Sequence, residues 1–563
     1  MHYVLAPHDE EFLAVLVEPD FQSGTLTTLH NHTIPAHEFP GWVHTQEREH
    51  HPRWVWADSA TTYRTLLAHG IRVEKCWDLR KARAILKNAA WVDPTAFMSG
   101  TNLAETTLWN GPAPEPTDGL FPSTPHVAID PVAEFQRQLH VLNTAEPHLR
   151  GRLQFLIAAE SAGTLTAAEM THAGVPWNRD IHNDILTAVL GPRPQPGFRP
   201  HALEDLARTL RSILDAPNLN PDSPRELLKT LQRAGLKINS TNKWEIRDID
   251  HPVIPPLLEY KKLSRMLSAN GWTWMDEWIK NGRFRPIYVP GGAATGRWGA
   301  DGGGALQLPH FVRPAIVADE GWTFVIADAA QLEPRILAAM SHDHAMAQAG
   351  RGHDMYQEIV NARVVESREH AKYGMLGAMY GGTTGVSAQV LPKFKIAFPR
   401  AMALVENAAR AGEQGRTVHT WLGRTSLPGV FEQTGEGDDP TSTRDRMARA
   451  RSYGRFTRNF ICQGTAAEWA LCWMAQVRQD LWQLTLREAE TTATVDARVE
   501  QGPHLVFFLH DEILIHTPTH LAQQVAELVT KAAQRAGTLL FGDSDVEFPV
   551  TAAINTSYTN PKT

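Results

Sequence analysis

The chain has 563 residues, and its 54 lysines and arginines against 62 aspartates and glutamates give a formal net charge of −8 at pH 7. That length allows roughly three or four domain-sized units. The charge excludes a uniformly basic protein but leaves room for local basic clusters that bind phosphate. Three scattered cysteines are too few for a disulfide framework or a zinc site, so a reducing compartment is expected. No apolar run is long enough to span a membrane and the first residues do not resemble a signal peptide, which predicts a soluble intracellular protein.

The pattern along the chain predicts several α/β and helical regions in succession. Up to about residue 110, short strand-like runs alternate with helical stretches such as 59–69 and 79–87, as in a small α/β domain. A Pro-rich polar connection follows at 111–126, and helices then dominate to about residue 285. A Gly-rich stretch begins there and ends in a strand followed by a helix. Helices return over 346–480, a flexible insertion is expected at 435–446, and further strands follow.

The stretch LVFFLHDEILIH, residues 505–516, places three polar residues between two strand-like apolar runs. These residues are His510, Asp511 and Glu512. Charged side chains are rarely buried unless they are paired or hold a metal ion. The stretch therefore indicates a site rather than ordinary packing.

A second carboxylate occupies a similar position in FVIADAAQLEPRILAAM, residues 324–340. Asp328 stands where a buried strand stops, and the helix that follows has Pro334 in its first turn. Asp328 could simply cap that helix. If the two strands are neighbours in one sheet, Asp328 and Asp511 can instead converge on one or two divalent cations. Oxygen ligands suit magnesium, and two such metals can assist phosphoryl transfer.

The stretch between these strands, SREHAKYGMLGAMYGG (367–382), predicts a helix with a functional stripe. Arg368, Lys372, Leu376 and Tyr380 are spaced by four and share one face. Two cations followed by an apolar and an aromatic residue suit a nucleotide triphosphate. The alternative is an ordinary amphipathic helix with solvated cations. The acidic strand ends on either side of the helix favour nucleotidyl transfer.

Four ordered blocks of the chain resemble family A DNA polymerases, the class of bacterial DNA polymerase I. They are DAAQLEPRIL (328–337), RxxxKxxxLGxxYG (368–381), RFTRNFICQGTAAEWA (455–470) and HDE (510–512). Shorter similarities are ATGR (294–297) and LQLP (306–309). The resemblance implies a multidomain α/β and α+β protein, with an exonuclease-like α/β domain before a right-hand polymerase domain. The implied parts are a degenerate 3′–5′ exonuclease-like domain (1–150), a mostly helical thumb (151–285), the first part of the palm (286–345), the fingers (346–435) and the second part of the palm (436–563).

The resemblance also implies a role for each matching residue. Two Mg²⁺ ions, or Mn²⁺, would be held by Asp328, Asp511 and the carbonyl of Ala329. Glu333 would act as a steric gate against a ribose 2′-hydroxyl. The implied catalytic residues are Asp328, Asp511, Glu512 and Lys372; those at the incoming dNTP are Arg368, Lys372, Leu376, Tyr380, Glu333, Tyr356 and Gln331; those at primer–template DNA are Arg297, Gln307, Arg335, Arg455, Asn459, Gln463 and His510.

Four positions depart from the family pattern. Ala329 and Ala330 replace the usual Tyr-Ser, and Leu376 replaces an aromatic residue, which leaves sugar discrimination open. Tyr356 stands where the family has a histidine that helps to hold the triphosphate, with His353 nearby as a possible substitute.

The first domain lacks the carboxylates that an exonuclease of this family needs. Thr62 and Ser161 stand at two of the expected aspartate positions, and Asp9 and Glu11 are expected in a hairpin turn. A scaffold or DNA guide without proofreading is therefore expected.

The resemblance predicts a monomeric DNA polymerase for repair or gap filling, with primer–template DNA and dNTPs as partners and no membrane, in the bacterial cytoplasm at the nucleoid. Three alternatives stay open. The exonuclease could survive through other carboxylates, such as Asp58 or Asp78; the chain could be a metal-dependent phosphohydrolase; or it could be an inactive DNA-binding paralogue.

Overall fold

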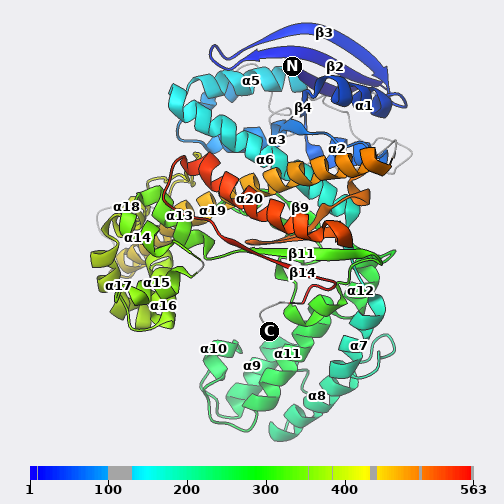
Figure 1. Ribbon diagram of the computed structural model, residues 1–563. Coiled ribbons are helices and arrows are strands. Elements are labelled where there is room, and N and C mark those ends of the chain that lie inside the picture. The colour runs from blue at the N-terminus through cyan, green and yellow to red at the C-terminus, as the bar shows by residue number, and fades with distance from the viewer. Residues whose placement is uncertain are drawn as a thin grey trace. The chain divides into compact units, whose positions relative to one another are not determined.

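The computed structural model (Figure 1) divides the chain into two compact units, and each is treated by itself. The first unit comprises Met1–Ala173, Ile287–Asp301 and Gly321–Ile554, and the second comprises Gly174–Pro286, Gly302–Glu320 and Asn555–Thr563. The structure describes residues 1–8, 11–98, 130–352, 354–382, 385–431, 440–492 and 497–559. Asp9, His353, the predicted connection at 111–126 and the first part (435–439) of the predicted insertion at 435–446 lie outside these residues. None of the described helices is both long enough and apolar enough to cross a membrane.

The first unit begins with an α/β domain whose five-stranded sheet has the order β3-β2-β1-β4-β5. Strands β1 to β3 are antiparallel neighbours, whereas β4 runs parallel to both β1 and β5. Its core gathers Tyr3, Trp54, Trp56 and Tyr63, which are at most 4% exposed. The elements are β1 His2–His8, β2 Glu11–Asp20, β3 Thr25–Pro35, α1 Phe39–His50, β4 Arg53–Trp56, α2 Ser59–Ala68, β5 Lys75–Asp78, α3 Leu79–Asn88, η1 Pro94–Met98, α5 Pro131–Asn143 and α6 Pro147–Ala173.

A second sheet in the same unit, with the order β12-β13-β11-β14, carries the acidic strand ends. Its strands are apolar along almost their whole length because α20 packs on β11 and β13 and α6 packs on β12. The elements are β9 Ile287–Val289, β10 Gly299–Asp301, β11 Trp322–Ala329, η4 Val499–Gln501, β12 His504–Leu509, β13 Glu512–Pro518, η5 Thr519–Leu521, α20 Ala522–Phe541 and β14 Val550–Asn555.

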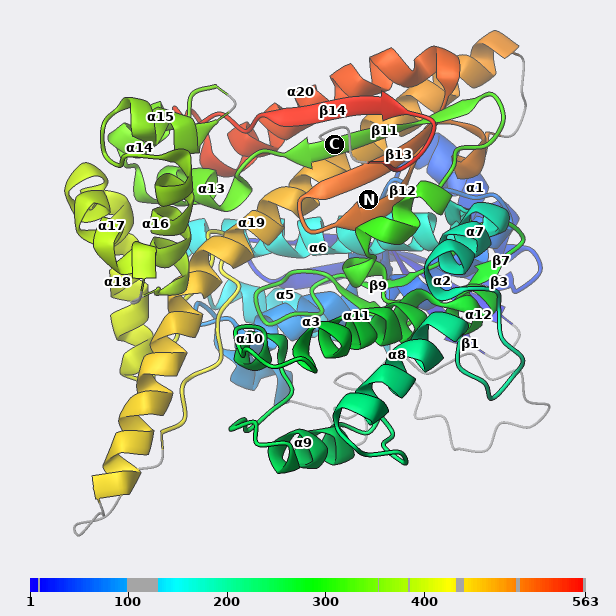
Figure 2. The same ribbon diagram turned by 90° about the horizontal axis from the view of Figure 1, so that it is seen from below.

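Helices fill the sequence between β11 and β12, as the sequence predicts. The long helix α19 packs against α18 and α20, and Figure 2 shows it running from beside the sheet out along α18. The elements are α13 Leu332–Ser341, α14 His344–Ala349, α15 Met355–Asn361, α16 Arg368–Tyr380, α17 Gly385–Ala397, α18 Pro399–Glu413 and α19 Pro440–Thr492.

The second unit is mostly helical, with a small three-stranded sheet of order β6-β8-β7. Asn178 caps α7, and the rings of Trp177, Trp274 and Phe284 pack together beside this sheet. The elements are β6 Val175–Pro176, α7 Arg179–Leu190, α8 His201–Ile213, α9 Pro224–Arg233, α10 Lys243–Ile246, α11 Ile254–Asn270, α12 Trp272–Trp278, β7 Ile279–Lys280, β8 Arg283–Phe284, η2 Ala305–Gln307 and η3 His310–Ala315.

A buried ionic network joins the α/β domain to α19 within the first unit. The carboxylate of Glu169 on α6 accepts hydrogen bonds from Arg478 on α19 at 2.9 and 2.7 Å and from the Tyr63 hydroxyl at 2.5 Å. Arg72 forms a further ion pair with Glu169 at 3.5 Å. The side chains of Glu169, Arg72 and Arg478 are at most 7% exposed, so the Glu169 carboxylate is the buried counter-charge that both guanidinium groups contact.

We predict that Glu169→Gln lowers the free energy of unfolding by about 3–5 kcal/mol, because it leaves two buried guanidinium groups without their carboxylate. Urea denaturation followed by tryptophan fluorescence measures this change. The matched control is Glu527→Gln, which removes the carboxylate of an exposed ion pair on α20 and should change little. Equal unfolding midpoints for the two variants would contradict the structural importance of the network.

Candidate active site

The structure brings the two predicted carboxylates to the same end of one sheet. Strands β11 and β13 are antiparallel neighbours, with Asp328 opposite Glu512. His510 and Asp511 form the turn between β12 and β13, and the backbone N–H of Ala329 donates to the Asp511 carbonyl at 3.0 Å. His510 adopts the left-handed conformation (φ 62°) that closes this turn. The adjacent acids of the HDE stretch therefore stand at a strand end, beside a third acid on the neighbouring strand.

Asp328 does not cap the helix that follows it. Strand β11 continues through Ala329, and the N-cap position of α13 is occupied by Gln331, whose side chain makes no capping bond. The capping interpretation of Asp328 is thus excluded.

The electrostatics of this strand end favour a bound cation. Burial, together with the negative charges of Asp328 and Glu512, raises the pKa of the Asp511 carboxyl to about 7. Arg297 is the neighbouring cation that opposes this effect. Carboxylate and carbonyl oxygens are the ligands that Mg²⁺ prefers, and a divalent ion would offset the repulsion, so the residues present fit such an ion.

Glu333 links this strand end to α16. Its carboxylate forms a salt bridge with Arg297 and accepts a hydrogen bond from the Tyr380 hydroxyl at 2.6 Å. Gln463 on α19 is a further hydrogen-bond partner of Tyr380. Burial lowers the pKa of His510, and the nearby charge of Arg297 lowers it further. Four residues expected at DNA or dNTP (Arg297, Glu333, Tyr380 and Gln463) are thus connected, and the charge of Arg297 acts on His510.

The predicted stripe on α16 forms as expected, and Ser367 caps the helix by accepting from the His370 N–H at 3.1 Å. The side chains of Lys372 and Tyr380 are exposed, and Leu376 is half-buried. Arg368 is also exposed, but it forms an ion pair with Asp354 at 2.7 Å. The cationic end of the helix is therefore accessible to a ligand.

Asp354 is a residue of this site that the sequence analysis missed. Besides pairing with Arg368, it accepts from the Gln331 amide at 2.8 Å and from the Tyr356 N–H at 3.1 Å. Gln331 in turn accepts from the Met355 N–H at 2.8 Å. The available signal was an aspartate directly before a short helical run, which is typical of an N-cap.

Arg335 requires a correction, because the structure buries it completely. Its guanidinium donates to the carbonyl oxygens of Ala330, Gly350, Gly352 and Glu547. The planar guanidinium group has five N–H donors, so one arginine can hydrogen-bond to several loop carbonyls at once. Arg335 therefore holds the loops behind the site and is not available to DNA.

The other predicted contact residues differ in accessibility. The ring of Tyr356 is buried under the Arg368 guanidinium, which lies 5.7 Å from its centroid, so it packs rather than points outward. Arg455 is exposed beside the end of α16, and Asn459 is half-buried with a side-chain oxygen that has no hydrogen-bond partner in the described part of the chain. Gln307 lies in the second unit, exposed at the end of η2.

The carboxylates considered for an exonuclease serve as helix caps. Asp78 is buried, caps α3 by accepting from the Lys81 N–H at 3.0 Å, and also accepts from the backbone and hydroxyl of Ser59. Ser161 accepts from the Asp78 N–H at 3.1 Å, and Asp58 caps α2 by accepting from the Thr61 N–H at 2.9 Å. Thr62 lies on α2, and Glu11 begins β2 at the predicted hairpin, across from His8.

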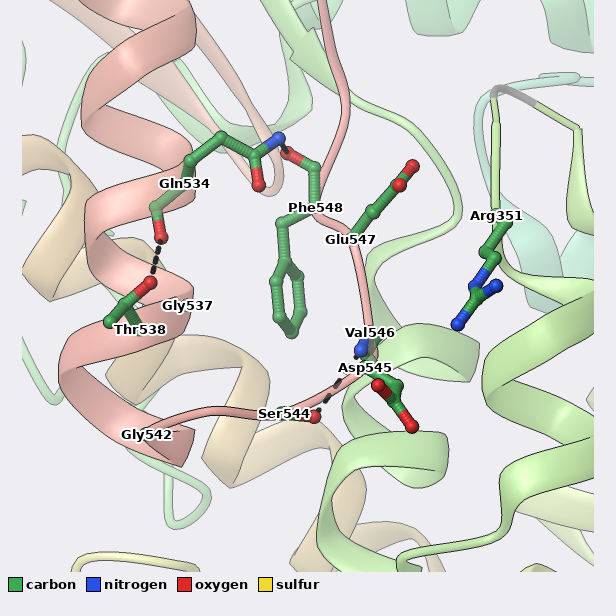
Figure 3. Close-up of a pocket in the computed structure, with 10 residues that line it drawn as sticks. All are labelled: Arg351, Gln534, Gly537, Thr538, Gly542, Ser544, Asp545, Val546, Glu547 and Phe548. Atoms are coloured by element: carbon green, nitrogen blue, oxygen red, sulfur yellow. Dashed lines mark hydrogen bonds between the residues drawn. The ribbon is translucent and has the colours of Figure 1, made fainter.

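A separate hollow of about 380 Å³ lies between α20, the segment that leads to β14 and the segment before α15. Figure 3 shows its charged side chains, Arg351, Asp545 and Glu547, around the hollow, with Gln534 bonded to the Phe548 carbonyl. None of the predicted catalytic or DNA-binding residues lines it. The candidate active site is therefore the open strand end and not this hollow.

Adjacent carboxylates beside a cationic helix are the arrangement that the class of metal-assisted phosphoryl-transfer enzymes uses. Comparison with known proteins identifies the family. Residues 200–560, more than half of the chain, match the model of DNA polymerase family A. The chain belongs to DNA polymerase family A.

Several relatives are bacterial DNA polymerases I. The protein of Aquifex aeolicus is 26% identical over 61% of this chain and 58% of its own length. The thermostable DNA polymerase I of Thermus filiformis is 25% identical over 51% of this chain and 34% of its own length, and the DNA polymerase I of Pseudomonas aeruginosa is 26% identical over 56% and 34%. The chain thus spans between about a third and three-fifths of these relatives.

A solved structure shares the fold over nearly the whole chain. It is the POL domain of Pol1 from M. smegmatis in complex with DNA primer-template and dNTP, which covers 97% of this chain and 95% of its own with a TM-score of 0.65. The sequence identity is 16%, so this likeness shows the fold alone.

We predict that Asp511→Asn stabilises the metal-free protein at about pH 8, by about 1–3 kcal/mol after discounting for partial exposure. The folded pKa of about 7 lies above the ordinary value of 3.8, so stability falls as the pH rises through this window and the carboxyl loses its proton. Asparagine carries no ionisable carboxyl, so the variant does not lose this stability as the pH rises.

Urea denaturation in a metal chelator, at about pH 4 and about pH 8, measures the difference. We expect no gain at the lower pH and a smaller gain when magnesium is added. A variant as stable as the wild type at both pH values would contradict the repulsion between the carboxylates.

Proposed function

We propose that the protein is a template-directed DNA polymerase that adds dNTPs to the 3′ end of a primer with the help of two divalent metal ions. One observation carries this proposal. A set of charged and polar groups runs from the Asp328–Asp511 strand end to α16: the charge of Arg297 lowers the pKa of Asp511, Arg297 forms a salt bridge with Glu333, and Glu333 accepts a hydrogen bond from Tyr380. It links a metal-type acidic edge to a helix with exposed cations, which is the combination that nucleotidyl transfer requires.

Each end of this arrangement has its own task. Asp328, Asp511 and the Ala329 carbonyl would hold magnesium or manganese, which supplies charge stabilisation for the attacking and leaving oxygens. Lys372 and Arg368 bind the triphosphate. Because Arg368 is paired with Asp354, the triphosphate must displace or share that carboxylate. Phosphate offers more acceptor oxygens than a carboxylate does, which favours the exchange.

Glu333 sets the sugar specificity in this proposal. Its two contacts, with Arg297 and Tyr380, hold its carboxylate where the resemblance expects the deoxyribose. Leu376 is aliphatic at the position where relatives have an aromatic ring, so more of the discrimination against ribose falls on Glu333.

The α/β domain acts as a scaffold without proofreading in this proposal. Asp58 and Asp78 are engaged as helix caps, and the Glu169 network ties the domain to α19. The proposed role is repair or gap filling by a monomer at the bacterial nucleoid. A phosphohydrolase is less well supported, because it has no need of the Gln463–Tyr380 contact beside the acidic edge.

We predict that Asp511→Asn lowers the rate of primer extension by about 10³-fold or more, since a bound metal supplies several kcal/mol and each 1.4 kcal/mol is tenfold. Steady-state extension assays with magnesium and fluorescence anisotropy of labelled primer–template measure rate and binding separately. Binding should persist, and Glu527→Gln, an exposed change on α20, should extend primers normally. Extension by the Asp511 variant at the rate of this control would rule out the assigned role.

We predict that Glu333→Ala raises the ratio of ribonucleotide to deoxyribonucleotide incorporation at least about tenfold, a discrimination that one pocket group can supply. Single-nucleotide extension with each substrate measures the ratio. Glu369→Ala, an exposed acid at the start of α16, is the control that should leave it unchanged. An unaltered ratio in the Glu333 variant would refute the gate.

A further inference from the structure

The first described turns of α19 carry an unusual density of arginine. Arg444, Arg446, Arg449, Arg451 and Arg455 fall within twelve residues of one helix. At about 100° per residue, Arg444, Arg451 and Arg455 lie within about 40° of one direction around the helix axis, whereas Arg449 lies about 160° from Arg451. Three of the five cations therefore form one stripe, and Arg446 and Arg449 lie on the other side of the helix.

The stripe is on the exposed side of α19. Arg444, Arg451 and Arg455 are exposed, and the described residues offer none of the three an ion pair within 4 Å. Farther along the helix, the side away from the stripe packs on α18, where the Thr457 hydroxyl donates to the Ala408 carbonyl at 2.8 Å. Arg449, nearer the start of the helix, is exposed. Like charges four residues apart, as at Arg451 and Arg455, disfavour a helix. An anionic ligand along the stripe would remove that repulsion.

The stripe continues the row that the proposed function assigns to DNA. Arg451, Arg455, Asn459 and Gln463 are spaced by four, so each follows the last along one slowly turning face. Gln463 bonds to Tyr380, and Arg455 lies so close to the end of α16 that a Cβ on Gly381 would meet its Cγ at 3.0 Å. The row thus begins beside the nascent base pair and leads away from it.

The two halves of α19 differ in the surface that they leave exposed. After Gln463, α19 is largely buried and packs on α20 and α6, so that half offers little surface to DNA. The half before Gln463 runs out along α18, beyond the end of α16 (Figure 2). The surface that can extend the DNA-binding row is therefore the half of α19 before Gln463.

We infer that Arg444 and Arg451 bind the phosphates of the unpaired template strand ahead of the primer terminus; this rests on the proposed function. The stripe is one side chain wide, and Arg444 and Arg451 are about 10 Å apart along the axis. A flexible single strand can follow so narrow a line, and the arginine fork binds phosphate oxygens in pairs. By binding these phosphates, the stripe positions the next template bases for entry beside Tyr380.

The test uses the full chain with both arginines changed, Arg444→Gln and Arg451→Gln together, and Arg449→Gln as the matched control on the opposite side. Fluorescence anisotropy gives the affinity for a labelled primer–template at several salt concentrations. One DNA has a long 5′ template overhang and the other has a single-nucleotide overhang. Thermal melts establish that these exposed changes leave the fold intact.

On the long overhang, the slope of log affinity against log salt concentration should fall by about 1.4 in the double variant, because each lost single-strand contact removes about 0.7. On the single-nucleotide overhang the slope should keep its wild-type value, and Arg449→Gln should match the wild type on both DNAs.

Three results would overturn the inference: an unchanged slope on the long overhang, an equal loss on both DNAs, or an equal loss in the control. Each leaves the proposed function standing provided the wild type binds and extends the primer. A wild type that does neither would refute the proposed function itself.

Discussion

The repulsion between two carboxylates at one strand end is the constraint on which the rest of this site depends. Asp328 lies on β11 and Asp511 lies in the turn between β12 and β13, and these largely buried strands hold the two backbones at one end of the sheet. Burial and like charge raise the pKa of Asp511 to about 7, which makes the ion-free pair unfavourable in neutral solution. A divalent cation relieves this cost, and the sheet can therefore hold the acids ready without a ligand cage of its own.

The surroundings of the pair distribute the remaining charge. Arg297 stands near Asp511 and binds Glu333, and Glu333 binds Tyr380, so acidic and basic groups alternate from the sheet to α16. Arg335 stabilises the loops behind them from a fully buried position. Such a network fixes side-chain positions before a substrate arrives, which is what nucleotidyl transfer needs when positioning and electrostatics supply most of the rate.

The sequence predicted the local elements of this site better than its contacts. The apolar runs before Asp328 and Asp511 and the four-residue spacing on α16 define a strand or a helix within a few residues, so these were found. The partners of Arg335 are carbonyls of loops as far away as residue 547, and no pattern in one sequence encodes them. The sequence did not indicate the role of Asp354 either, because its partner Arg368 lies beyond the whole of α15. The family pattern placed Arg335 at the DNA, but the tertiary fold encloses it.

The most direct test of the account is one denaturing gel of a 5′-labelled primer on a longer template, with magnesium, with and without dNTPs. The account predicts a longer product with dNTPs and a primer of unchanged length without them. A primer that stays unextended with dNTPs would contradict the polymerase assignment, and a primer that shortens without them would contradict the scaffold role of the α/β domain.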